Sequence, residues 1–175
     1  MKLLFENWRK YLEEDKEKPL KILMPPTDLK AARALIVKHT DTDPDGKMVF
    51  STGEGEKEKR GTPEEWVKTL PNNILPHEAL HAIQTQEMPE LFKGSSDILP
   101  DGWNKATDKQ KKDYFSVPAE IMAFAYDYAT KTTSADTSPE ETYGEYEKIG
   151  GKVFEKFKRY VEEYKKRLKK DEDSK

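Results

Sequence analysis

The chain of 175 residues contains no cysteine. This absence excludes disulfides, thiolate zinc sites and cysteine nucleophiles, so any bound metal must be held by histidine, aspartate or glutamate. Histidine is also scarce, since the whole chain has three. A metal site with nitrogen ligands therefore has few residues from which it can be built.

Long apolar runs are missing as well. No stretch approaches the roughly 18 apolar residues of a membrane span. The polar residues that follow Phe5 leave no room for the apolar core of about 7–15 residues that a secretory signal needs. The sequence thus predicts a soluble, cytoplasmic protein with no membrane partner.

The charges nearly cancel, because 31 Lys and Arg stand against 34 Asp and Glu for a net charge of −3. A protein that binds nucleic acid through a basic field is therefore not expected. Hydrophobic residues make up 34% of the chain and aromatic residues 10%. A chain of this length and composition can bury one core without covalent or metal staples.

Apolar periodicity and helix-capping residues predict an α+β fold, a small domain that is mostly helical, with a minor sheet and a long C-terminal helix. Helices are expected over 3–14, from Asp28 to about His39, from Thr62 to Pro71, from about Pro76 to Gln86, from Ser116 onward, and through the C-terminal third with a break at Gly150-Gly151. Strands are expected at Lys21–Met24 and Lys47–Thr52, a turn at 41–46, and irregular chain at 53–61 and 88–112. We divide the chain into an N-terminal amphipathic arm (1–18), one domain (19–170) and a disordered tail (171–175).

Two of the three histidines lie in the stretch P-H-E-A-L-H-A-I-Q at 76–84. Four positions apart on a helix, His77 and His81 share one face at about 6 Å, where two imidazoles can bind one tetrahedral metal ion. Glu78 is one step around the helix and can reach a water held by that metal, so it can act as a general base. A metal also brings the pKa of such a water toward neutrality. This is the chemistry of the H-E-x-x-H pattern.

The alternative is a core helix that carries two ordinary histidines. Leu80, Ala82 and Ile83 give the helix an apolar side in either case. Buried histidines without a metal would each need another polar partner. We favour the metal site because the motif and its helical context agree.

A catalytic zinc site usually has three protein ligands and one open position. Glu120 is our candidate for the third ligand, because it lies in an otherwise apolar stretch at 117–125, where a charge needs a partner. His39 is the other possible ligand, and a helix N-terminus alone could stabilise Glu120. Asp127 falls on nearly the same helix face as Glu120, either as a partner for a histidine N–H or as an ordinary exposed aspartate.

The motif H77-E78-A-L-H81, followed by E120-I-M-A, resembles the zincin metallopeptidases of the gluzincin type. The resemblance covers about residues 45–130. It implies one zinc ion per chain held by His77, His81 and Glu120, with Glu78 as general base and a peptide or protein as substrate. The metzincin extension of the motif does not fit, since A-I-Q-T-Q-E follows His81.

The resemblance also implies an edge strand before the active helix, along which an extended peptide binds. Lys47–Thr52 is the segment expected in that role, because strand addition satisfies the peptide backbone. An oxyanion stabiliser is expected too. The sequence leaves this choice open among Tyr114, Tyr126, Tyr128 and Tyr143.

The first residues, M-K-L-L-F-E-N-W-R-K-Y-L-E-E, resemble the short N-terminal headers on proteins of tailed bacteriophages, which implies a location within a virion. The alternative is a helix that docks its apolar stripe on the domain. Three rivals to a peptidase stay open: a non-catalytic metal-binding protein on a zincin-like scaffold, a helical virion or interaction protein with a fortuitous motif, and a metal hydrolase that acts on a non-peptide amide. Glu78 argues against the first, because a structural metal site needs no base.

Overall fold

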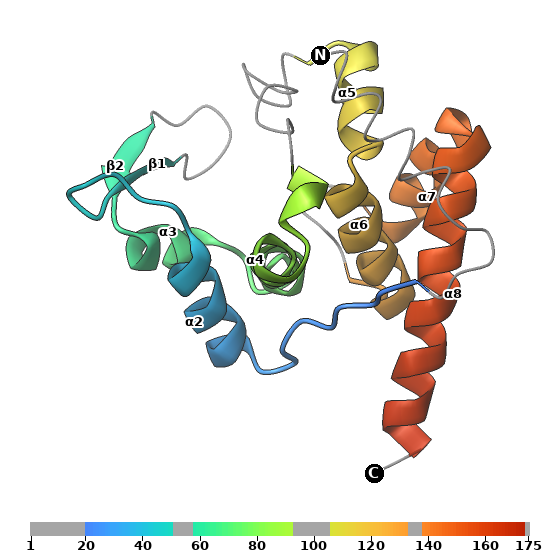
Figure 1. Ribbon diagram of the computed structural model, residues 1–175, viewed down its shortest axis with the longest axis horizontal. Helices are drawn as coiled ribbons and strands as arrows, with labels where there is room; N and C mark the ends of the chain where they lie inside the picture. Colours follow the sequence, from blue (N-terminus) through green and yellow to red (C-terminus); the bar gives the residue numbers. More distant parts are fainter. Residues whose placement is uncertain (1–19, 51–57, 93–105, 133–137, 174–175) are drawn as a thin grey trace.

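The computed structural model describes residues 20–50, 58–92, 106–132 and 138–173. These form the mostly helical α+β domain that the sequence predicts (Figure 1). The helices are α2 (Leu29–His39), α3 (Pro63–Thr69), α4 (Leu75–Glu87), the 3-10 turn η1 (Pro89–Phe92), α5 (Asp108–Phe115), α6 (Pro118–Thr130), α7 (Pro139–Ile149) and α8 (Gly151–Asp173). The strands β1 (Met48–Phe50) and β2 (Lys59–Gly61) form a two-stranded antiparallel sheet.

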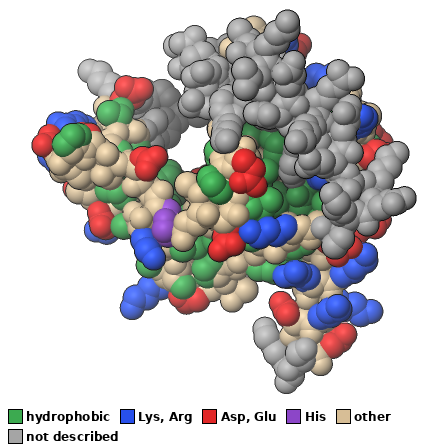
Figure 2. Space-filling view, in the orientation of Figure 1, with side chains coloured by type: hydrophobic (Ala, Val, Ile, Leu, Met, Phe, Trp, Pro, Cys, Tyr) green, Lys and Arg blue, Asp and Glu red, His purple; other side chains and the backbone are tan. Residues whose placement is uncertain are grey.

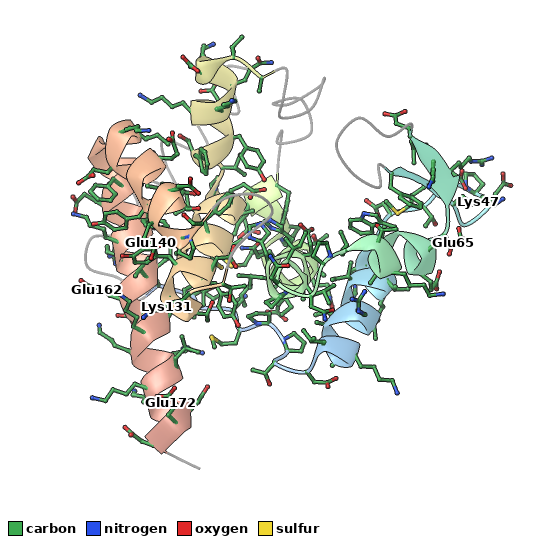
Figure 3. The ribbon with its side chains drawn as sticks, turned by 180° about the vertical axis from the view of Figure 1, so that it is seen from behind. Lys47, Glu65, Lys131, Glu140, Glu162 and Glu172 are labelled. Atoms are coloured by element: carbon green, nitrogen blue, oxygen red, sulfur yellow. The ribbon has the colours of Figure 1, made fainter. Side chains whose placement is uncertain are left out.

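Helix α4 is the middle layer of the domain. It packs against α2 on one side and against α6 on the other, and α6 packs in turn against α7 and α8 (Figure 1). The view from behind shows the same order, with Glu65 of α3 and Glu162 of α8 marking the two opposite sides (Figure 3). Leu75 of α4 belongs to the smaller hydrophobic cluster with α2 and α3, whereas Leu80 belongs to the larger cluster with α6 and α8. The histidine helix therefore lies between two cores.

Three helix starts predicted from capping residues are confirmed, whereas Ser116 ends α5, and α6 begins at Pro118 without a side-chain cap. Asp28 accepts a hydrogen bond from the first turn of α2, and both Thr62 and Ser138 form complete capping boxes. These side chains satisfy backbone N–H groups that have no partner within the helix. The break between α7 and α8 is also where the sequence predicts it, at Gly150-Gly151.

The small sheet was predicted only in part. Met48–Phe50 form β1 within the expected strand, and residues 51 and 52 lie outside the described part of the chain. The expected loop at 53–61 was wrong at its end, because Lys59–Gly61 pair with β1 as β2. Arg60 of β2 bonds to Asp43 and Asp45 in the predicted turn. Charged, exposed strand residues of this kind give no hydrophobic alternation from which to predict a strand.

The strand predicted at Lys21–Met24 is absent from the structure, in which residues 20–26 are irregular. Ile22 and Leu23 are nevertheless buried in the larger cluster. The Tyr164 hydroxyl donates a hydrogen bond to the Leu23 carbonyl at 3.0 Å. The apolar run is thus buried as an extended segment, and its described backbone joins no sheet.

The expectation of irregular chain at 88–112 was also wrong in two places. Residues Pro89–Phe92 form the turn η1, and α5 begins at Asp108 with Thr107 and Gln110 as its capping box. The capping pair is readable in the sequence. The helix itself gives no apolar periodicity, because α5 is rich in lysine and aspartate and has a single buried residue, Phe115.

Helix α8 continues to Asp173, three residues into the segment assigned to the tail. Figure 2 shows lysine and arginine side chains along its free end, where Lys165, Lys166, Arg167, Lys169 and Lys170 are exposed. The arm at 1–18, with its expected helix and virion-header role, lies outside the described residues. None of the described helices is both long and apolar enough to cross a membrane.

Candidate metal centre

The centre forms where α4 packs against the first turn of α6. Pro76 lies in the first turn of α4, and the helix presents His77 and His81, one turn apart, on one face. Glu120 lies in the first turn of α6. The three side chains are largely buried, with exposed fractions of 6% for His77, 16% for His81 and 12% for Glu120. Among the described residues, these three form the group that can hold a metal ion.

The distances within the group suit a tetrahedral ion. The two histidine Nε2 atoms are 3.0 Å apart. The Oε2 atom of Glu120 lies 3.6 Å from Nε2 of His77 and 3.5 Å from Nε2 of His81. Metal–ligand bonds of about 2.0–2.1 Å at tetrahedral angles place ligand atoms about 3.3 Å apart. One small cation thus fits among the three atoms without a change of fold.

Hydrogen bonds on the far side of each ring determine where the histidine protons lie. Nδ1 of His77 is 2.7 Å from Oδ2 of Asp127, and Nδ1 of His81 is 2.8 Å from Oε1 of Gln84. Both partner atoms are acceptors, so each Nδ1 carries the hydrogen and each neutral ring presents a lone pair at Nε2. The proposed partnership between Asp127 and a histidine is thereby confirmed.

Three acceptor atoms consequently converge on one buried point. The Oε2 atom of Glu120 has no hydrogen-bond donor within the described chain. Buried acceptors that face one another with no donor or cation between them are costly. A proton or a metal ion at this point relieves that cost.

The electrostatics of the group favour positive charge. Burial by itself lowers the pKa of His77, but Asp127 and Glu120 outweigh burial and raise the pKa well above its ordinary value. Burial likewise opposes the charged form of His81, whereas Glu120 raises its pKa. Burial would raise the pKa of Glu120, yet the neighbouring His81 and His77 hold it well below the usual range. The group therefore favours added positive charge, which a proton or a metal ion can supply.

Glu78 and Tyr114 lie beside the three candidate ligands. Glu78 is half-buried, and its charge contributes to the raised pKa values of His81 and Tyr114. Burial, followed by the charge and hydrogen bond of Glu120, raises the pKa of Tyr114 well above its ordinary value. Glu78 and Tyr114 therefore interact electrostatically with the candidate ligand residues.

Of the four tyrosines left open by the sequence, Tyr114 is the one the structure brings to Glu120. Tyr126 packs on Tyr164 at a ring distance of 5.3 Å, and Tyr128 packs on Tyr143 at 5.1 Å. The sequence could not single out Tyr114 because its approach to Glu120 depends on how α5 and α6 pack together.

Two aromatic rings enclose the histidines. Phe124 of α6 contacts the His77 ring edge-on at 5.0 Å, and Phe92 of η1 contacts the His81 ring at 5.8 Å. Together with Gln84, these are the centre's residues that sequence reasoning missed. Gln84 had a readable signal, since it follows His81 by three positions and therefore lies beside it on the helix.

His39, the alternative ligand, does not join the group. Its Nε2 atom is buried at the end of α2 and has no hydrogen-bond partner among the described residues. The described residues that converge are His77, His81 and Glu120. The structure therefore favours Glu120 over His39 as the third candidate ligand.

The expected edge strand lies apart from the centre. In Figures 1 and 3 the β1–β2 hairpin is at the outer end of the α2–α3 side, away from α4. Val49 of β1 is 58% exposed there. Its role in binding a peptide stays a prediction.

Comparisons with protein-family models, curated proteins and solved structures find no match for this chain. The function is therefore inferred from the chemistry of the centre itself.

Proposed function

We propose that this protein is a zinc-dependent metallopeptidase of the gluzincin type, with one zinc ion per chain held by His77, His81 and Glu120 and with Glu78 as general base. The main support is the convergence of two Nε2 lone pairs and a carboxylate oxygen on one point, at separations that suit tetrahedral coordination. We further propose that it acts in the cytoplasm, or within a virion if a bacteriophage encodes it.

The donor set fits zinc. Two imidazoles and one carboxylate form a known catalytic set, which leaves a fourth position for water or substrate. Each histidine also donates its other N–H to a second side chain, as metal-binding histidines usually do. His81 and Glu120 are the more exposed of the three residues, so water would reach the group through their side of the described structure.

The catalytic roles follow from the residues around that position. When bound, zinc would polarise a substrate carbonyl and bring the pKa of water toward neutrality. Glu78 lies beside His81 and is not part of the ligand group, so its carboxylate is free to take a proton from water and pass it to the leaving amine. The Tyr114 hydroxyl is protonated at neutral pH, as tyrosine ordinarily is, and it can donate a hydrogen bond to a developing oxyanion.

The test combines metal content with hydrolysis. Elemental analysis of protein purified without chelator should find about one zinc per chain in the wild type and little in His81→Ala. The wild type should cleave members of a peptide library, and Glu78→Gln should keep the zinc and lose cleavage. The Glu78 variant is the matched control, because it changes one atom near the metal without removing a ligand.

Other outcomes would support the rivals. Stoichiometric zinc with no cleavage of any peptide would indicate a metal-binding protein without catalysis. Cleavage of non-peptide amides alone would indicate a different hydrolase. No zinc, even after reconstitution, would show that the motif is fortuitous and would direct attention to protein partners.

A further inference from the structure

Gln84 is a buried polar side chain, and both the oxygen and the nitrogen of its amide form hydrogen bonds. Its exposed fraction is 0%, and it lies on α4 one turn beyond His81. Its Nε2 atom donates to the Ala119 carbonyl at 3.1 Å, and its Oε1 atom is 2.8 Å from Nδ1 of His81. A buried amide is costly unless both ends are satisfied, and here both are.

These contacts determine the orientation of the amide. The Ala119 carbonyl can only accept, so the amide NH₂ must face it. The amide oxygen must then face His81, which requires the hydrogen of that ring on Nδ1. The bond to the backbone of α6 thereby determines the tautomer of a side chain on α4.

We propose that Gln84 is the positioning residue for His81: it holds the lone pair of His81 Nε2 toward the metal position and joins that ring to the helix turn that carries Glu120. The proposal rests on the zinc site proposed above. Ala119 immediately precedes Glu120, so one amide couples the second histidine to the backbone beside the third ligand. Asp127 performs the same task for His77 with a carboxylate.

The competing explanation is that Gln84 merely joins α4 to α6. Gln84→Met and Gln84→Glu separate the two, because methionine removes the acceptor for His81 and glutamate retains it. The control is Gln86→Met, which makes the same substitution on the same helix at an exposed residue.

Isothermal titration of the full-length chain with zinc is the first measurement. Gln84→Met should bind zinc about 10- to 100-fold more weakly than wild type, as expected for an outer-shell partner. Gln84→Glu should bind within about tenfold of wild type, because a carboxylate replaces the amide acceptor as Asp127 does for His77. Gln86→Met should bind as the wild type does. Wild-type affinity in Gln84→Met would overturn the proposal.

The second measurement needs no metal, and so separates this proposal from the proposed function. Long-range ¹H–¹⁵N NMR of the metal-free protein at alkaline pH reports the tautomer of each histidine, and the His81→Ala spectrum assigns the signal. Wild type and Gln84→Glu should show the hydrogen of His81 on Nδ1, and Gln84→Met should show Nε2–H or a mixture. If Gln84→Met kept the wild-type tautomer, the proposal would be overturned. If Gln84→Met does not fold, an Nε2–H tautomer in Gln84→Glu would overturn it instead. If the wild type binds no zinc but the tautomers follow this pattern, the proposed function fails and the role of Gln84 is limited to setting the tautomer of His81, so the two failures are distinguishable.

Discussion

At the scale of single residues, two hydrogen-bond acceptors determine how the centre is arranged. Asp127 and Gln84 accept from the Nδ1–H groups of the histidines, so both Nε2 lone pairs face Glu120. The H-E-x-x-H pattern and an isolated glutamate at 120 were enough to predict His77, His81 and Glu120 as a group. The pattern could not predict Phe92 and Phe124, because their contribution depends on how α4, η1 and α6 pack together. It could not choose among tyrosines for the same reason. The position of Gln84 beside His81 was readable, but its hydrogen bond to the Ala119 carbonyl was not.

Replacement of Glu120 by glutamine tests the third ligand. The amide keeps the shape of the side chain but lacks the negative charge that faces the two histidines. We expect zinc affinity to fall by more than the roughly 10- to 100-fold typical of outer-shell substitutions. Equilibrium dialysis against a competing chelator measures this, with Glu78→Gln as the control. Stoichiometric zinc in Glu120→Gln at wild-type affinity would make the assignment wrong.

The raised pKa values of His77 and His81 predict how pH affects the metal-free protein. A histidine with a raised pKa stabilises the fold fully below its unfolded value of 6.5 and loses that effect as pH rises through the folded pKa. The lowered pKa of Glu120 acts in the opposite sense, since its effect is present above 4.5 and is lost as pH falls. In chelator, stability against urea should thus be greatest between about pH 4.5 and 6.5 and should decrease above that range. Saturating zinc should offset the decrease, because the metal takes the place of the protons; a decrease of the same size with zinc bound would contradict this.

At the scale of elements, local capping signals predicted helix starts well, and hydrophobic runs predicted strands poorly. Asp28, Thr62 and Ser138 act within one turn, so the sequence alone determines their effect. Ile22 and Leu23 of the run at Lys21–Met24 are buried, and Leu23 bonds to Tyr164 of α8, a contact between distant segments that no local pattern records. The short strand β2 was missed because its charged residues face solvent.

Replacement by alanine should have opposite effects on the free energy of unfolding at two glycines, one inside α7 and one at its end. Gly150 has φ +67° and ψ −166°, a region that is close to glycine-only, so Gly150→Ala should destabilise the protein by about 1–3 kcal/mol. Gly144 lies inside α7 with no atom within 4 Å of an added Cβ, so Gly144→Ala should stabilise it by roughly 0.5–1 kcal/mol. Urea unfolding of the two variants measures the difference. Equal effects of the same sign would show that the break between α7 and α8 does not require the conformation of Gly150.

At the scale of the whole molecule, α4 belongs to both hydrophobic clusters, and the candidate ligands join it to α6. Zinc bound to His77, His81 and Glu120 would therefore link the two sides of the domain through its middle layer. A ligand that binds only the folded state stabilises it by about 2.7 kcal/mol at a free concentration 100 times its Kd. Leu75 and Leu80 make α4 part of both clusters. The stabilisation that zinc gives should therefore extend to the whole fold.

We accordingly expect added zinc to raise the Tm of the wild type while unfolding stays a single transition. With Trp8→Phe and Trp103→Phe in the same chain, Trp66 is the remaining tryptophan. Circular dichroism and fluorescence of that protein should shift together, because Trp66 packs against the smaller cluster and the ligand Glu120 lies on α6, which belongs to the larger one. His81→Ala should show no zinc-dependent shift. If zinc moved the circular dichroism transition and left the fluorescence transition in place, the two clusters would unfold independently, and α4 would not couple them.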